Sequence, residues 1–134
     1  AGLDLSPCFY RKALYQKAPL MPEGYMERKL GKGPSVCKEE PFTILLAHSP
    51  LYFDSYARWG ADLTLAGHFH GGTIRIPGLG GVMTPQYQFF LPWCAGDFER
   101  NGKRMIVSRG LGTHSINIRL NNRPQLVLIR LRRA

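Results

Sequence analysis

The residues best suited to chemistry in this sequence are three histidines, each placed just after an apolar run. His68 and His70 are one residue apart, within the glycine-flanked stretch Gly67–Gly72. In an extended segment the side chains of residues i and i+2 leave the same face, so both imidazoles can point to one place. His48 follows a second apolar run, residues 43–47. Because imidazole is a common ligand of zinc and other transition metals, the three histidines predict a metal site.

Both histidine-bearing segments follow strands of one predicted parallel sheet. Phe42–Ala47 is an apolar run of the kind that is buried on both faces in an α/β sheet, and Asp62–Ala66 is the next strand. Between them, Ser49 and Pro50 predict the start of a helix that ends at Gly60. This order favours parallel pairing and an α/β fold, in which ligands bind beyond the carboxyl ends of the strands. All three histidines fall there.

The first part of the chain gives weaker patterns. Ser6-Pro7 is typical of a helix start, and a second short helix is expected over residues 25–30. We expect a single domain over residues 1–134, in which residues 1–40 are a helical and loop lead-in. Residues 41–134 would then form a β-rich core that carries the metal ligands.

The segment after the histidines shows the alternation and the turn residues of short strands. We expect a strand over residues 73–76, an ordered loop over 77–92, a hairpin that joins 97–100 to 104–108 through Asn101-Gly102, and a hairpin that joins 115–120 to 125–131 through 121–124. The last part of the chain is therefore expected to be β-rich and antiparallel.

Composition indicates a globular domain with basic charge. The 134 residues include 18 Lys and Arg against 9 Asp and Glu, which gives a formal net charge of +9. This excess favours polyanionic partners such as anionic cell-wall polymers, phospholipid headgroups or phosphorylated substrates, with ordinary solubilising charge as the alternative. No basic-aromatic motif of the known nucleic-acid-binding kinds is present, so specific nucleic-acid recognition is not expected. The three cysteines lack Cys-x-x-Cys spacing, which argues against a zinc–thiolate site.

Few carboxylates are available to complete a metal site in this sequence. Beyond residue 40 the acidic residues are Asp54, Asp62, Asp97 and Glu99. None of them follows a predicted strand near the histidines. Two-metal hydrolytic sites need carboxylates to bridge the ions and balance their charge. The histidines alone therefore fit a site with one metal, or part of a site with two.

Two segments taken together resemble the calcineurin-like metallophosphoesterases: residues 44–50, Ile-Leu-Leu-Ala-His-Ser-Pro, and residues 60–72, which end in Gly-His-Phe-His-Gly-Gly. The likeness continues through residues 73–77, 107–112 and 121–126, and it covers residues 41–131. It is greatest to bacterial members that are anchored at the membrane or exported across it. The resemblance implies that setting for this protein, with the cytoplasm as the alternative.

The resemblance implies a fold, a reaction and residue roles. The fold is a four-layer αββα sandwich, and this chain would be its C-terminal half, with a mixed sheet and a β-rich C-terminus. Two metal ions, Mn, Fe or Zn, lie between the carboxyl ends of the two sheets. His48 and His68 resemble ligands of one ion, and His70 resembles a ligand of the other. The reaction is in-line hydrolysis of phosphomono- or phosphodiesters by water that the two metals activate.

Two further residues are candidates for contacting the substrate phosphate. Arg109 can position an anion through bidentate hydrogen bonds, and a structural salt bridge is the alternative. His114 follows in the same glycine-containing loop and can reach the phosphate or form a surface hydrogen bond.

The family's first-half motifs Asp-x-His and Gly-Asn-His do not occur in this sequence. They supply the remaining metal ligands, so we expect this chain to be inactive alone and to need the missing N-terminal half or a second copy. Two other classes stay open. One is a non-catalytic basic module that binds an anionic cell-wall polymer or lipid. The other is a zinc protein with a single three-histidine site.

Overall fold

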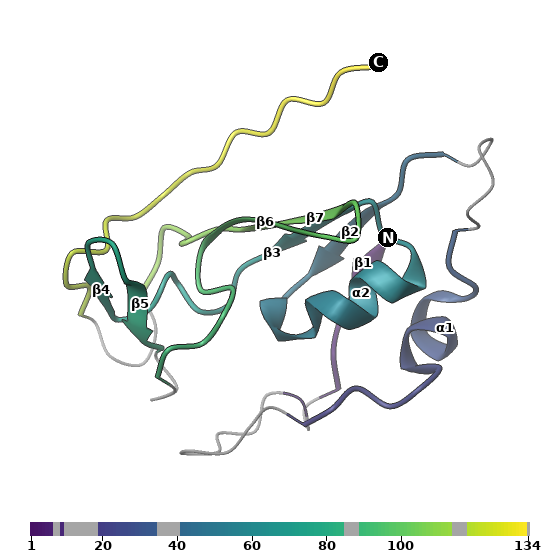
Figure 1. The fold of residues 1–134 in the computed structure, drawn as a ribbon, viewed down its shortest axis with the longest axis horizontal. Helices are drawn as coiled ribbons and strands as arrows, with labels where there is room; N and C mark the ends of the chain where they lie inside the picture. The colour runs from purple at the N-terminus through teal and green to yellow at the C-terminus, as the bar shows by residue number, and fades with distance from the viewer. Residues whose placement is uncertain (7–8, 10–18, 35–40, 85–88, 114–117, 134) are drawn as a thin grey trace.

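The computed structural model describes residues 1–6, 9, 19–34, 41–84, 89–113 and 118–133. Its main element is a five-stranded sheet in the order β1-β2-β3-β7-β6 (Figure 1). The strands are β1 (Gly2–Leu3), β2 (Ile44–Ala47), β3 (Leu63–Ala66), β6 (Gly96–Arg100) and β7 (Lys103–Val107). Strands β1, β2, β3 and β7 run parallel, and β6 is antiparallel to β7. The predicted α/β class with a mixed sheet is therefore confirmed.

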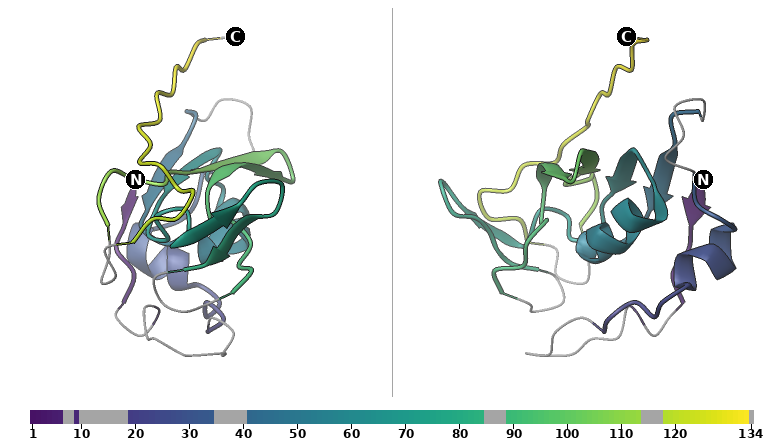
Figure 2. Two further views of the ribbon diagram at one scale, coloured as in Figure 1. Left: turned by 90° about the vertical axis from the view of Figure 1, so that its left-hand side faces the viewer. Right: turned by 45° about the vertical axis from the view of Figure 1, so that its right-hand side comes forward.

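Both helices lie on one side of this sheet, as the two views of Figure 2 show. The predicted short helix is α1 (Tyr25–Leu30). The predicted crossover helix is also present, as a 3₁₀ turn, η2 (Pro50–Tyr52), followed by α2 (Phe53–Trp59). The helix predicted to begin at Ser6-Pro7 falls almost wholly outside the described residues. Within the described ranges, no helix is long and apolar enough to cross a membrane.

Local sequence explains where the crossover helix begins and ends. The Ser49 hydroxyl accepts a hydrogen bond from the Leu51 amide at 3.4 Å, as a helix N-cap does. At the other end Gly60 has φ 112°, and its amide reaches the Ala57 carbonyl at 3.1 Å. Only glycine adopts that conformation without strain, so the helix stops there and the chain can enter β3.

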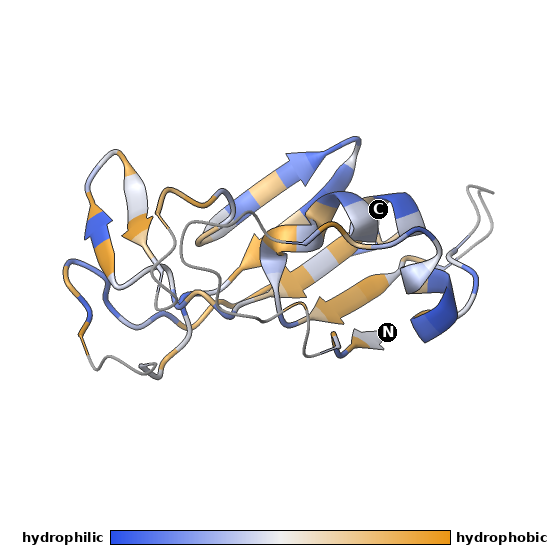
Figure 3. Ribbon diagram, turned by 90° about the horizontal axis from the view of Figure 1, so that it is seen from below, coloured by the Kyte–Doolittle hydropathy of each residue, from blue (hydrophilic) through white to orange (hydrophobic). Residues whose placement is uncertain are grey.

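The helix-facing side of the sheet forms the core. Leu45 of β2 and Met105 of β7 are fully buried, and both occupy the same row of the register as Thr64 of β3. Phe53 and Tyr56 of α2 cover this row and are 1% and 0% exposed. Figure 3 shows the central strands coloured hydrophobic over much of their length, as strands with apolar side chains on both faces should be.

The opposite side of the sheet carries apolar side chains that no helix of the described structure covers. Leu46, Leu65 and Ile106 share one row of the register across β2, β3 and β7. Leu46 is 55% exposed, and the other two are half-buried. We call these three residues the open row. An open apolar row on a parallel sheet is unusual, because such sheets are normally covered on both faces.

A small second sheet follows the loop that carries His68 and His70, and one prediction for this segment is wrong. It pairs β4 (Ile74–Ile76) with β5 (Gly80–Met83) in antiparallel orientation. The expected loop over residues 77–92 therefore contains a strand, although residues 85–88 lie outside the description. The strand was not predicted because glycine is not typical of strands. At Gly81 glycine is needed for the close approach of the Gly71 backbone, since a Cβ there would lie 2.7 Å from the Gly71 carbonyl oxygen.

Of the two predicted hairpins, the first is confirmed; the second is wrong in its second strand, residues 125–131, and residues 115–117 of its first strand lie outside the described residues. Asn101 and Gly102 have φ values of 52° and 70° and join β6 to β7 as a two-residue turn. Residues 125–131, by contrast, form no strand, and this segment runs away from the body of the protein (Figure 1). Its Leu126 and Leu128 are 84% and 86% exposed. The alternating pattern is that of a strand, but no partner strand is present in the described part of the chain.

Candidate functional site

His48 and His68 meet at the carboxyl ends of two neighbouring strands. His48 directly follows β2, and its carbonyl accepts a hydrogen bond from the Gly67 amide, just after β3, at 3.2 Å. This bond holds the two strand ends together. The His48 Nε2 and His68 Nδ1 atoms are 2.7 Å apart, and the two ring centroids are separated by 4.5 Å. The β2–β3 pairing therefore brings two imidazole nitrogens from residues 20 positions apart to one point.

The loop that carries His68 and His70 is sharply turned rather than extended. Residues His68, His70, Gly71 and Gly72 have φ values of 69°, 50°, 77° and 88°. Left-handed conformations cost a non-glycine residue roughly 1–2 kcal/mol, so surrounding contacts must hold the two histidines in place. One such contact is Phe69, which is fully buried between them.

His70 makes different contacts from His68. Its Nδ1 lies 3.1 Å from the Gly112 carbonyl oxygen and 3.4 Å from Nη2 of Arg119. The extended conformation expected for residues 68–70 is therefore wrong, because His68 and His70 both have positive φ values, and their Nδ1 atoms contact different partners. The structure brings His48 and His68 together, and it places the His70 ring against the loop that follows β7.

These residues fit part of a metal site. Two imidazole nitrogens facing each other are donors of the type that zinc, iron and manganese sites use, and the rings are half-buried or exposed. Within the ranges that the structure describes, however, no three His, Cys, Asp or Glu side chains gather as a group that could hold a metal. The described residues thus supply a nitrogen pair without the carboxylates that a two-metal site requires.

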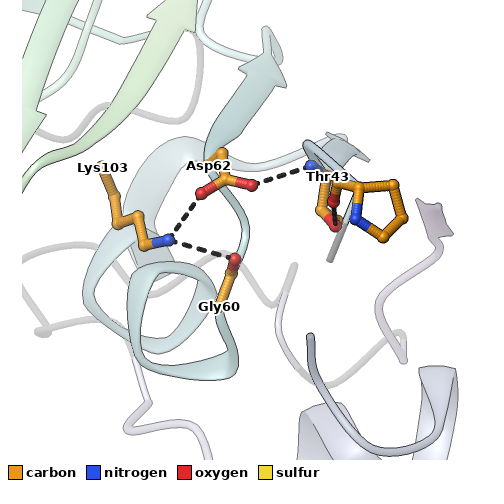
Figure 4. A network of polar contacts seen from close by, with 5 residues as sticks. Thr43, Gly60, Asp62 and Lys103 are labelled. Atoms are coloured by element: carbon orange, nitrogen blue, oxygen red, sulfur yellow. Dashed lines mark hydrogen bonds and ion pairs between the residues drawn. The ribbon is translucent and has the colours of Figure 1, made fainter. Parts of the chain in front are cut away.

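Asp62, one of the four acidic residues beyond residue 40, lies at the other end of β3 from His68 and has a structural role. Its Oδ1 accepts a hydrogen bond from Lys103 Nζ at 2.6 Å, and its Oδ2 accepts one from the Thr43 amide at 2.8 Å (Figure 4). Lys103 also donates to the Gly60 carbonyl at 3.4 Å. Burial alone would raise the pKa of Asp62, but the bonds from Lys103 and Thr43 and the lysine charge outweigh it, so the pKa is lowered.

Of the two residues predicted to contact substrate, Arg109 is described by the structure and His114 is not. Arg109 donates from Nε to the Gln125 side-chain oxygen at 3.0 Å, in place of the salt bridge considered as its alternative. Its aliphatic stem lies over Gly71, since a Cβ there would be 2.5 Å from the Arg109 Cγ. A contact with substrate remains a prediction for Arg109. His114 lies outside the described residues.

Two residues near the histidines were missed by sequence reasoning. Asn122 is 1% exposed and donates from Nδ2 to the carbonyls of His70 and Gly72. Arg119 donates to the carbonyls of Arg109 and Gly112, and the Gly112 carbonyl also contacts His70. The Asn-Asn pair at 121–122 lies in a predicted hairpin turn and within the family resemblance, but neither signal predicts a contact with the histidine-bearing segment.

This arrangement defines an α/β domain with imidazole donors at the carboxyl ends of parallel strands, and the comparisons with known proteins identify its relatives. The chain is 31% identical over 91 residues to the uncharacterized metallophosphoesterase YkuE of Bacillus subtilis (strain 168), covering 68% of this chain and 31% of the relative. It is 30% identical over 101 residues to the phosphodiesterase YaeI of Escherichia coli (strain K12), and the match covers 71% of this chain and 36% of the relative. YkoQ of Bacillus subtilis, another uncharacterized metallophosphoesterase, is 28% identical over 88 residues, and the match covers 66% of this chain and 33% of the relative.

Over the aligned residues, the resemblance to the metallophosphoesterases stated from the sequence is therefore confirmed. The chain spans about a third of the length of these relatives. No family model matches the sequence. No solved structure matches it either.

Proposed function

We propose that this chain carries the C-terminal part of the metal site of a phosphoesterase that hydrolyses phosphomono- or phosphodiesters. The observation that carries the proposal is the contact of His48 Nε2 with His68 Nδ1 at 2.7 Å, at the carboxyl ends of β2 and β3. The names of the relatives supply the class of reaction, and the histidine pair supplies the donor chemistry.

In this proposal His48 and His68 hold one metal ion and His70 holds a second. When bound, two such ions, Mn, Fe or Zn, would activate a water molecule and polarise the phosphate ester for in-line attack. The chain's own part is to fix the imidazoles in place. Arg109 and His114 would contact the substrate phosphate from the loop after β7. The remaining ligands, carboxylates above all, would come from outside this sequence.

The open row supports the proposal that further chain covers this sheet. Leu46, Leu65 and Ile106 face away from α2, and Leu46 is 55% exposed. A second sheet from an N-terminal half of the protein would bury this row and complete a four-layer sandwich, as the family resemblance implies. A second copy of this chain is the other way to cover it. The net charge of +9 supports a setting beside an anionic membrane or cell-wall surface.

The first test measures Zn²⁺ and Mn²⁺ binding to the chain by equilibrium dialysis and elemental analysis. We expect His48→Ala and His68→Ala to lower Zn²⁺ affinity at least about tenfold, because each removes one of two convergent donors. The matched control is His114→Ala, which removes a histidine that the proposal assigns to substrate. Equal binding by the His68→Ala variant and the unchanged chain would refute the proposed metal role.

The second test needs a protein that contains this chain together with the Asp-x-His and Gly-Asn-His motifs. We expect it to hydrolyse bis(p-nitrophenyl) phosphate in the presence of Mn²⁺, and we expect His68→Ala to abolish turnover. The 134-residue chain alone should show none. Normal turnover by the His68→Ala variant would contradict the assignment.

A further inference from the structure

We infer that Asn122 is a positioning residue that holds the backbone of the histidine loop, residues 67–72, in the conformation that presents His68 and His70. The inference rests on the proposed function in one respect, namely that these histidines bind metal. It assigns a task to a residue that lies some 50 positions away in the sequence.

The Asn122 amide is placed to clamp the loop at two points. Its Nδ2 donates to the His70 carbonyl at 2.6 Å and to the Gly72 carbonyl at 2.5 Å. A side-chain amide has two N–H donors, and here both are used on the two carbonyls that flank Gly71. The side chain is 1% exposed, so water does not compete for these bonds.

The orientation of this amide is fixed by what surrounds it. Asn122 Oδ1 is buried and has no hydrogen-bond partner among the described residues. Rotating the amide by half a turn would place this oxygen against two carbonyl oxygens and would lose both bonds. Gly71 makes the approach feasible, because a Cβ at that residue would lie 2.8 Å from Oδ1. Asn122 and Gly71 therefore form one fitted contact.

The loop needs such a clamp. His68 and His70 both have left-handed backbone conformations, which L-residues adopt only when their surroundings impose them. Within the loop the described backbone bonds are few: the Phe69 amide reaches Gly67 O at 2.8 Å, and the Gly72 amide reaches Phe69 O at 2.7 Å. The His70 carbonyl takes the Asn122 bond instead. The Gly71 carbonyl accepts from Arg75 Nη1 at 3.0 Å, so without Asn122 the carbonyls on either side of Gly71 would lose their bonds to the segment after β7.

The segment that bears Asn122 is itself anchored on both sides. The Leu120 amide donates to the Thr73 carbonyl at 2.9 Å, and the Gln125 amide donates to the Gly110 carbonyl at 3.0 Å. Between these points Asn121 adopts φ 53°, which turns the chain so that the next side chain enters the interior. Asn122 thus transmits the position of the loop after β7 to the histidine loop.

The test compares Asn122→Asp with Asn121→Asp. The first keeps the shape of the side chain but replaces the donor with an oxygen that faces two carbonyls. The second makes the same chemical change at an exposed neighbouring residue and serves as the matched control. Hydrogen–deuterium exchange is measured on the metal-free chain, and Zn²⁺ affinity is measured by equilibrium dialysis.

In Asn122→Asp we expect the amides of residues 69–73 to exchange at least about tenfold faster, with exchange in β3 and β7 unchanged and Zn²⁺ affinity lowered at least about tenfold. Asn121→Asp should change neither quantity by more than about twofold. Faster exchange in β3 and β7 would mean that the first variant unfolds, and the comparison then uses Asn122→Ala, which removes the same donors without adding charge.

The test distinguishes failure of the proposed role of Asn122 from failure of the proposed metal binding. Loop exchange and Zn²⁺ affinity that stay at the level of the unchanged chain, in the variant that keeps its fold, would overturn the role of Asn122. If the unchanged chain binds no Zn²⁺, the proposal that His48 and His68 bind metal within this chain alone fails. The exchange measurement then still decides whether Asn122 holds the loop.

Discussion

Removing the carboxylate of Asp62 should destabilise the chain without affecting the histidines. In Asp62→Ala the Thr43 amide loses a charge-assisted bond of 2.8 Å, and Lys103 loses its partner at 2.6 Å. A hydrogen bond to a charged group contributes about 1.5–3 kcal/mol, and an ion pair whose members are about 30% exposed adds about 0.2–1 kcal/mol. We expect a loss of about 2–3 kcal/mol in the free energy of unfolding.

The Asp62→Asn variant separates charge from hydrogen bonding. Its side-chain oxygen can still accept from the Thr43 amide, so the expected loss is only about 1 kcal/mol. Urea unfolding followed by tryptophan fluorescence measures both losses. Zn²⁺ binding should stay unchanged in both variants, because Asp62 lies at the opposite end of β3 from His68. A loss in Asp62→Asn as large as that in Asp62→Ala would refute the reasoning.

The same network makes a pH-dependent contribution with a defined sign. The pKa of Asp62 is lower in the folded chain than its ordinary value of 3.8, so folding favours the ionised carboxylate. Its contribution is therefore fully present above about pH 4 and is lost as the pH falls through the folded pKa. The stability difference between the unchanged chain and Asp62→Asn should accordingly be constant near neutral pH and shrink below pH 4. A difference that grows on acidification would contradict this sign.

Two further predictions concern single residues. Cys94 is 6% exposed, and burial raises the pKa of its thiol to about 11 despite the opposing charge of Arg75. Iodoacetamide at pH 8 should therefore label Cys94 far more slowly in the folded chain than in urea, as measured by peptide mass spectrometry. Gly60→Ala should lower the free energy of unfolding, measured in urea, by about 2 kcal/mol, and Gly102→Ala should lower it by about 1 kcal/mol. Both glycines have positive φ, but only a Cβ at Gly60 would meet a backbone atom, the Pro34 carbonyl oxygen, at 2.9 Å. Equal labelling rates, or equal losses for the two glycines, would count against these arguments.

Local signals predicted the elements whose ends are set by a few neighbouring residues. Ser49-Pro50 and Gly60 bound the crossover helix because a cap and a left-handed glycine act within one turn. Asn101-Gly102 likewise specifies its hairpin through two φ values. The strand predicted over residues 125–131 failed because alternation describes only the strand itself. A strand also needs a partner, and that partner is not in the described part of the chain.

For the site, the sequence predicted that His48 and His68 come together at neighbouring strand ends, but it did not predict the conformation of the loop that carries His70. The pairing of β2 with β3 brings His48 to His68, and both strands were predictable from their apolar runs. The turn between His68 and His70 was not predictable from spacing, because it depends on glycines and on the distant Asn122. A buried amide that bonds two backbone carbonyls leaves no local signature in the sequence, since Asn-Asn is equally typical of a turn.

The strands separate the two ends of this sheet by roughly 13 Å, the length of four extended residues. Because β7 runs parallel to β3, its first residue and the Asn101-Gly102 turn lie at the end where Asp62 sits, opposite His68. That turn is exposed, and a Cβ at Gly102 would meet nothing within 4 Å. It is therefore the place to insert an affinity tag or a fluorescent reporter, which would follow the chain in pull-down or imaging work while leaving the histidine-bearing loops untouched.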